Sequence, residues 1–311
     1  MKPFRETLMA NKQIHARAAL LSCVLLSWAA LADAPPTGRA DLSQRNVQFN
    51  QLSAEHGLSQ EMVYDIAQDK RGLIWIATQE GLNRYDGREI KVFEHLRTDP
   101  NTLSHDFVRS LLVDRDGALW VGTEAGVNRY NTQEHRFERQ PFADVGLTKL
   151  PSDSIRAMLQ AKDGTFWFGT ASSGLLHVDP RVGLLRQFRH NPEKAEGLPD
   201  DTVLALLEDS KGNLWVGTRT AGLFRFDPVG DRFVSYGTST DPDVINVGRE
   251  IRRIYEDQSG ILWIATADAG VTRFDLRRNA FERFSHNHDV PGSLGDNRVR
   301  DVIEDARGTI W

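Results

Sequence analysis

The chain has 311 residues, of which 40% are hydrophobic and 26% charged, a composition typical of a soluble globular protein with a sizeable core. Its formal net charge of −5 leaves no basic surplus, so nucleic acids and anionic membrane surfaces are not expected as main partners. The single cysteine, Cys23, excludes a disulfide framework and any metal or iron–sulfur centre built from several cysteines.

The N-terminal segment predicts export. Residues 1–17 carry four basic side chains and one acidic one, and an apolar stretch over residues 18–32 follows, ending in Ala30-Leu31-Ala32. A basic segment, an apolar core and a small-x-small site together indicate a secretory signal peptide. The apolar stretch is shorter than the roughly 20 residues that span a membrane. We therefore expect a cleaved signal peptide over residues 1–32, followed by a flexible leader over residues 33–46.

The tryptophans reveal an internal repeat. One of the seven, Trp28, lies in the signal segment. The other six are separated by 45, 47, 48, 48 and 48 residues: Trp75, Trp120, Trp167, Trp215, Trp263 and Trp311. A fixed period of 40 to 50 residues indicates a repeat architecture, in which each repeat is one structural unit.

Each repeat contains four short candidate strands. In the first repeat they cover residues 62–68, 73–78, 82–85 and 90–93. The turn between the first two, Asp69-Lys70-Arg71-Gly72, combines an aspartate that bonds the backbone ahead with a glycine that accepts positive φ. Four strands in 45 to 48 residues leave no room for a helix and indicate the blade of a β-propeller. We predict an all-β protein with a propeller over residues 47–311, in which the repeated tryptophans fill the space between blades.

The motif in each repeat identifies a family. The first repeat contains Leu58-Ser59, then Val63, Ile66 and Asp69 at regular spacing, followed by Gly72, Trp75 and Thr78. Both halves of this motif recur in register over residues 47–311, which strongly resembles the two-component regulator propeller repeat family. The third repeat departs from the pattern, with Ala161 in place of the aspartate and His177 in place of an arginine.

The resemblance implies a function. Such repeats form the periplasmic input domain of membrane sensors, in which two propellers precede a β-sandwich, a transmembrane helix and a histidine kinase or diguanylate cyclase. The resemblance also implies seven blades per ring, whereas this chain holds about five and a half. We therefore expect an N-terminal fragment of a longer sensor, located in the periplasm and tethered to the inner membrane in the full-length protein.

The partial ring has a physical consequence. The segment 47–52 matches the fourth-strand pattern without a blade of its own, so we predict that it is the strand that closes the ring. With a truncated sixth repeat the ring stays incomplete, and an open arc with an unpaired strand edge is prone to aggregation.

Variable turns mark the expected ligand-binding face. The turns between second and third strands vary in length and chemistry and share one face with the long connectors between blades, and variable loops on a rigid scaffold usually carry binding. We expect a small polar ligand there, such as a saccharide. The candidate ligand-binding residues are Gln79, Glu80, Glu124, Ser172, Ser173, Arg219 and Asp268.

Three histidines recur at every second blade. His95, His190 and His286 each follow a phenylalanine by two residues and open a connector. Because one ligand cannot reach three equivalent positions on separate blades, a structural role is predicted. His286 and His288 could bind a metal, but two ligands without a carboxylate constellation are a weak signal, so no metal site is assigned.

No catalytic residue and no cofactor is assigned, because the chain lacks a nucleophile elbow, a metal-binding helix motif, a phosphate loop and a kinase motif. Two alternatives stay open. One is a catalytic propeller, either a lyase or a quinone-dependent dehydrogenase, whose repeat has a similar Asp-x-x-Gly-x-x-Trp spacing; the other is a protein-interaction platform. The expected partners are the polar ligand, the remainder of the sensor chain and, in the full-length protein, a second copy of it.

Overall fold

The computed structural model describes residues 51–311 apart from 148–149, 151–153, 195 and 238–246. The predicted signal peptide over residues 1–32, the leader over 33–46 and residues 47–50 of the predicted closing strand lie outside the described residues. Gln51 and Leu52, the last two residues of that segment, are not in a strand.

The described residues form five four-stranded antiparallel sheets, each with its strands in chain order. The first two blades consist of β1 (Val63–Gln68), β2 (Ile74–Thr78), β3 (Gly81–Tyr85), β4 (Ile90–Phe93), and of β5 (Val108–Val113), β6 (Leu119–Thr123), β7 (Gly126–Asn131), β8 (Arg136–Glu138). The third consists of β9 (Ile155–Gln160), β10 (Phe166–Thr170), β11 (Leu175–Asp179) and β12 (Gly183–Phe188). The last two consist of β13 (Val203–Glu208), β14 (Leu214–Thr218), β15 (Leu223–Asp227), β16 (Arg232–Tyr236), and of β17 (Ile251–Glu256), β18 (Ile261–Thr266), β19 (Val271–Asp275), β20 (Ala280–Phe284). Two short 3-10 helices, η2 (Ala54–His56) and η3 (Ala143–Val145), lie in connecting segments.

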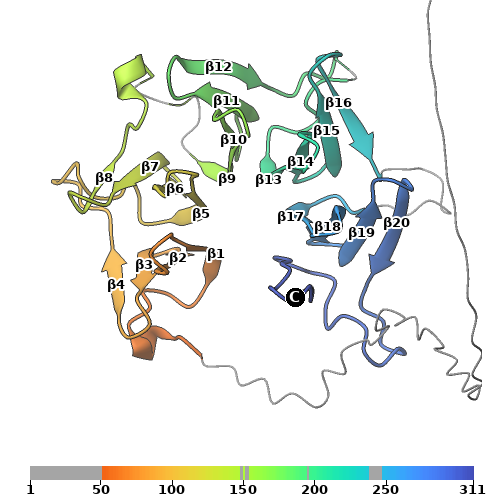
Figure 1. Ribbon diagram of the computed structural model, residues 1–311, viewed down its shortest axis with the longest axis horizontal. Helices are drawn as coiled ribbons and strands as arrows, with labels where there is room; N and C mark the ends of the chain where they lie inside the picture. Colours follow the sequence, from red (N-terminus) through yellow and green to blue (C-terminus); the bar gives the residue numbers. More distant parts are fainter. Residues whose placement is uncertain (1–50, 148–149, 151–153, 195, 238–246) are drawn as a thin grey trace, which may run out of the picture. The chain divides into compact units, whose positions relative to one another are not determined.

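The blades are arranged as a β-propeller, as predicted. The first strand of each blade lies nearest the centre of the ring in Figure 1, and each of these inner strands contacts the inner strand of the next blade. The predicted strand boundaries of the first repeat agree with the structure to within one residue. A sixth repeat is represented by a β-bridge between Glu304 and Ile310. The seven blades that the resemblance implies for a complete ring, and the unpaired strand edge expected of this chain, stay predictions.

The tryptophans of the first four blades are buried between blades, which confirms their predicted role in the core, whereas Trp263 is half-buried and Trp311 is exposed. Trp75 and Trp215 are fully buried. The Trp75 ring contacts Tyr130 of the second blade at a centroid distance of 5.1 Å, and Trp215 contacts Phe274 of the fifth blade at 5.9 Å. Such aromatic contacts bury large apolar surfaces and favour edge-to-face geometry. They therefore fix each blade against its neighbour.

An aspartate holds the tryptophan and the turn before it in every repeat but the third. In the fourth blade, Asp209 accepts hydrogen bonds from the Trp215 indole at 3.0 Å and from the backbone N–H groups of Lys211 and Asn213. The third blade carries Ala161 at this position, and its tryptophan, Trp167, instead stacks on His177 at a centroid distance of 3.9 Å. The two departures from the repeat motif are thus neighbours in space.

Hydrogen bonds to side chains also join one blade to the next. The last residue of an inner strand accepts a hydrogen bond from a turn N–H of the preceding blade, as from Lys162 to Glu208 and from Ser210 to Glu256. Glu304 of the sixth repeat accepts the equivalent bond from Gln258. Because each of these hydrogen bonds joins only adjacent repeats, the fold is stabilised through nearest-neighbour contacts. Within the described part of the chain, no helix is long and apolar enough to cross a membrane.

Candidate ligand-binding cavity

A cavity of about 420 Å³ lies where the inner strands of the blades face one another. The second residue of several inner strands points into it, because the first residue, such as Ile155 or Ile251, is buried between blades and side chains alternate along a strand. The cavity is lined by Tyr64, Arg109, Arg156, Ala171, Thr202, Leu204, Arg219, Glu250, Arg252 and Arg300. Loop residues from the predicted binding face, such as Arg219, thus meet residues from the ring axis.

Two arginines of adjacent blades share one carboxylate. The Glu124 Oε1 atom lies 2.6 Å from Nε of Arg109 and 3.3 Å from a terminal nitrogen of Arg156. Burial on its own raises the pKa of Glu124, but hydrogen bonds from Ser154 and Arg109 and the charges of Arg156 and Arg109 lower it below its ordinary value. Glu124 is therefore an ionised counter-charge at neutral pH.

The remaining arginines are less well neutralised. Arg252 pairs with Glu250 at 2.7 Å. The side chains of Arg219 and Arg300 form no ion pair with another described residue. Five arginines in the cavity against two glutamates, Glu124 and Glu250, leave an excess of three positive charges. The cavity is therefore electropositive although the chain as a whole is acidic.

A second cavity of about 270 Å³ continues along the axis and shares Tyr64 and the inner-strand arginines with the first. Its lining includes Asp65 and Asp301. Asp301 pairs with Arg253 at 3.1 Å, and Asp65 accepts a hydrogen bond from the backbone N–H of Leu111 at 2.7 Å. Burial raises the pKa of Asp65. The inner-strand arginines therefore line both cavities, and the second cavity adds the carboxylates of Asp65 and Asp301.

The structure separates the predicted binding residues into four groups, of which the two serines form the last. Arg219 lines the cavity, and Glu124 neutralises two of its arginines. Gln79 and Glu80 are exposed on the β2–β3 turn and do not line it. Asp268 accepts hydrogen bonds from the backbone N–H of Arg249 and so fixes a connector. A role of these residues in ligand binding stays a prediction.

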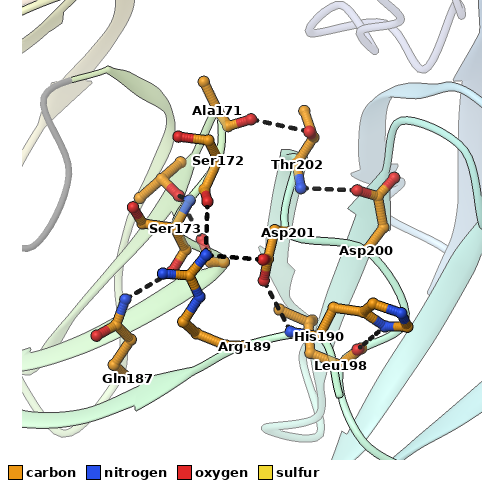
Figure 2. A network of polar contacts seen from close by, with 12 residues as sticks. Ala171, Ser172, Ser173, Gln187, Arg189, His190, Leu198, Asp200, Asp201 and Thr202 are labelled. Atoms are coloured by element: carbon orange, nitrogen blue, oxygen red, sulfur yellow. Dashed lines mark hydrogen bonds and ion pairs between the residues drawn. The ribbon is translucent and has the colours of Figure 1, made fainter. Parts of the chain in front are cut away.

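Ser172 and Ser173 belong to a network that joins the third blade to its connector (Figure 2). The Ser172 carbonyl and the Asp201 carboxylate both accept hydrogen bonds from Arg189. The Ser173 carbonyl accepts one from Gln187 at 2.9 Å. Both serines thus contribute backbone groups to these contacts, and the network positions the turn beside the cavity.

The three recurring histidines have the structural role that was predicted. The Nδ1 atoms of His95, His190 and His286 lie 2.6, 3.1 and 2.6 Å from the backbone carbonyls of Leu103, Leu198 and Leu294. Each histidine thus closes the loop that follows its blade. Among the described residues, no group of three or more histidine, cysteine, aspartate or glutamate side chains is placed to hold a metal ion.

Sequence reasoning missed the arginines of the inner strands. Arg109, Arg156, Arg252 and Arg300 each follow a valine or isoleucine at the same position of their repeats. A basic residue that recurs at one strand position in four repeats was the available signal. On a single strand, a polar residue that alternates with apolar ones indicates a solvent-facing side chain.

Replacing Glu124 with glutamine should destabilise the protein by about 1–3 kcal/mol, because two partly buried guanidinium groups lose a charged acceptor. The folded-state pKa of Glu124 is lowered, so its contribution is present above the ordinary glutamate pKa and is lost as the pH falls below it. Urea unfolding at pH 7 and at pH 4 measures both effects. The matched control is Glu80→Gln, on the equivalent turn and without an ion pair among the described residues. Equal effects of the two substitutions would contradict the assigned role of Glu124.

Comparison with known proteins identifies the repeats. The two component regulator propeller model matches residues 57–80, 102–125, 149–172, 197–220 and 247–268. The extracellular domain of the hybrid two-component system BT3049 from B. thetaiotaomicron has 26% sequence identity and a TM-score of 0.68, over 82% of this chain and 32% of that chain. A segment of 58 residues, 19% of this chain, is 38% identical to histidine kinase P4 of Formosa agariphila and covers 4% of that protein.

The propeller architecture also occurs in an enzyme. Virginiamycin B lyase from Staphylococcus aureus has a TM-score of 0.52 and 13% identity, over 74% of this chain and 71% of that chain. At this identity the likeness concerns the fold alone. The chain spans about a third of the BT3049 domain and a small fraction of the kinase.

Proposed function

Because this chain carries five repeats of the two-component regulator propeller family, we propose that it is the ligand-sensing domain of an exported, membrane-anchored signal-transduction sensor. The output domain of that sensor is a histidine kinase or a diguanylate cyclase. Three findings support the proposal: the predicted signal peptide over residues 1–32, the likeness to an extracellular domain of a hybrid two-component system, and the segment shared with a histidine kinase.

The observation that carries the proposal is the axial cavity. Its volume of about 420 Å³ lies in the range of small-molecule sites. It is lined by residues of the innermost strands together with Arg219 from a variable turn. Several of its charged side chains have hydrogen-bonding capacity left over, which suits a small polar ligand such as a saccharide. We assign it a binding role rather than a catalytic one.

A ligand in this cavity touches several blades at once. Arg109, Arg156 and Arg252 belong to the second, third and fifth blades. A ligand that bonds to side chains of several blades stabilises one arrangement of those blades relative to others by its differential affinity. This provides a physical route from binding to a change in the remainder of the sensor.

The test is a response in the cell that makes the protein. Saccharides and other small polar compounds are supplied singly, and kinase-dependent transcription or cyclase product is measured. A ligand at 100 times its Kd should also stabilise the purified protein by about 2.7 kcal/mol, seen as a rise in Tm. The double substitution of Arg156 and Arg252 by glutamine should abolish the response without changing the amount of protein. A response that survives the double substitution, or quinone absorbance in the purified protein, would contradict this function.

A further inference from the structure

We propose that the axial cavity is an anion-binding site, in which Arg156 and Arg252 hold a carboxylate, sulfate or phosphate group of the ligand. This inference rests on the proposed function, since it names the ligand class of the same cavity. Five arginines surround the cavity, and two glutamates neutralise part of their charge. The positive charge is local to the cavity, because the chain as a whole carries a net negative charge.

Unused hydrogen-bond donors point to the ligand class. The Nε atoms of Arg156 and Arg252 are buried and have no hydrogen-bond partner among the described residues. A guanidinium offers five N–H donors and no acceptor, so an acceptor of negative charge satisfies it best. A buried donor without a partner is energetically unfavourable. Two such donors, on the third and the fifth blade, line one cavity and indicate a partner that binds there.

The arginines of the cavity also repel one another. Burial, and then the positive charges of Arg109 and Arg219, lower the pKa of the Arg156 guanidinium. Glu124 opposes this effect, but its Oε1 atom is shared between Arg156 and Arg109. An anion beside Arg156 would remove the repulsion and supply the missing acceptors together.

The arginines of the cavity differ in how far their hydrogen-bond donors are already used. The Arg109 guanidinium is already occupied, because it lies 3.5 Å from the Phe107 ring centroid and bonds to Glu124. It forms a wall of the cavity together with Tyr64, whose ring centroid is 4.9 Å away. Arg156 and Arg252 keep free donors, and Arg219 and Arg300 have no ion-pair partner among the described residues.

The size of the cavity restricts the ligand to a small molecule. The positive charge is confined to a volume of about 420 Å³ at the axis of an acidic protein, which favours a compact anion over an extended polyanion. A non-sugar organic or inorganic acid and an acidic sugar share this chemistry. Comparing citrate and sulfate with galacturonate as probes distinguishes the non-sugar acid from the acidic sugar.

The experiment measures binding by isothermal titration calorimetry at low ionic strength. The probes are citrate, sulfate, galacturonate and galactose, and the last two differ in the carboxylate. At least one anion should bind, and galactose should bind at least tenfold more weakly than galacturonate. Arg156→Gln and Arg252→Gln should each weaken the binding of that anion tenfold or more. Tighter binding of citrate or sulfate supports a non-sugar acid, and tighter binding of galacturonate supports an acidic sugar.

Two further variants protect the test against misfolding. Glu250→Gln releases Arg252 from its ion pair and should tighten anion binding severalfold, a gain that a damaged fold cannot produce. Arg278→Gln removes one positive charge from the exposed β19–β20 turn, where Arg278 pairs with Asp275 outside the cavity lining, and should change affinity less than twofold. If no probe anion binds, or if galactose binds as well as galacturonate, the inference is overturned. The proposed sensing function then still stands where an uncharged compound drives the cellular response through this cavity.

Discussion

A Gly174→Ala variant is expected to lose roughly 2–5 kcal/mol of unfolding free energy. Gly174 starts the turn into β11 with a φ of +76°, a conformation that costs an L-residue about 1–2 kcal/mol. In addition, a Cβ atom at this position would lie 1.9 Å from the backbone carbonyl oxygen of Phe188. That oxygen belongs to β12, so the β11–β12 pairing has to shift to make room.

The matched control is Gly164→Ala in the same blade. Gly164 has a φ of +89°, but a Cβ atom there meets nothing within 4 Å. This variant carries the backbone cost without the clash, and its loss should stay near 1–2 kcal/mol. The shift of the urea midpoint, followed by tryptophan fluorescence, measures both variants. Equal losses would show that the close approach of β12 has no energetic weight.

An Asp209→Ala variant is expected to lose about 3 kcal/mol or more, because one buried and three partly buried N–H donors lose their acceptor together. The Asp209 carboxylate is fully buried and accepts hydrogen bonds from the Trp215 indole, the Asn213 amide and two backbone N–H groups. Trp215 is itself fully buried, so water cannot replace the lost partner. Circular dichroism and urea unfolding measure the loss.

The same aspartate predicts a pH dependence. Burial on its own raises the pKa of Asp209, but the hydrogen bonds from Trp215 and Asn213 lower it overall. Because the folded-state pKa is lowered, the stability that the carboxylate contributes is present above the ordinary aspartate pKa of about 3.9 and is lost as the pH falls below it. The stability difference between wild type and Asp209→Ala should therefore shrink on acidification. A constant difference between pH 7 and pH 3 would contradict the ionised state of Asp209.

Asp305→Ala is the matched control for Asp209. Asp305 accepts the same kind of bonds from Trp311 and from the backbone of its turn, but Trp311 is 52% exposed, so water can replace the carboxylate. We expect a loss below 1 kcal/mol for this variant.

The third blade shows the repeat without this aspartate. Ala161 stands at the aspartate position there, and a cavity of about 600 Å³ lined by Trp167 and His177 adjoins it.

The blades could be predicted because their signals are local. Asp69 and Gly72 define a turn within four residues, and the structure shows the Asp69 carboxylate bonded to the turn backbone and Gly72 at a φ of +85°. Alternation of apolar residues then sets the strands on either side. The glycine three residues before each tryptophan and the threonine three residues after it keep the same register in the following repeats.

The candidate site was predicted only in part, because it combines residues of variable turns with residues of inner strands. A sequence pattern indicates the turns, but only the ring brings the inner strands together. Variable turns identified Arg219, which lines the cavity, and Glu124, which pairs with two of the arginines that line it. The same reasoning included Ser172 and Ser173, which contribute backbone groups to the network beside it. Nothing in the local pattern distinguishes a turn residue that faces the axis from one that faces solvent.

The sequence by itself determined the four-stranded repeat, its period, the buried tryptophans and the family, since each depends on residues within one blade. Only the tertiary structure decided that Arg109, Arg156 and Arg252 converge, because they lie on separate blades and meet through the curvature of the ring. It also decided which charges are shared and which donors stay unused, as at Glu124 and the Nε atom of Arg156. Charge pairing across blades depends on distance in space, and a repeat period carries no information about it.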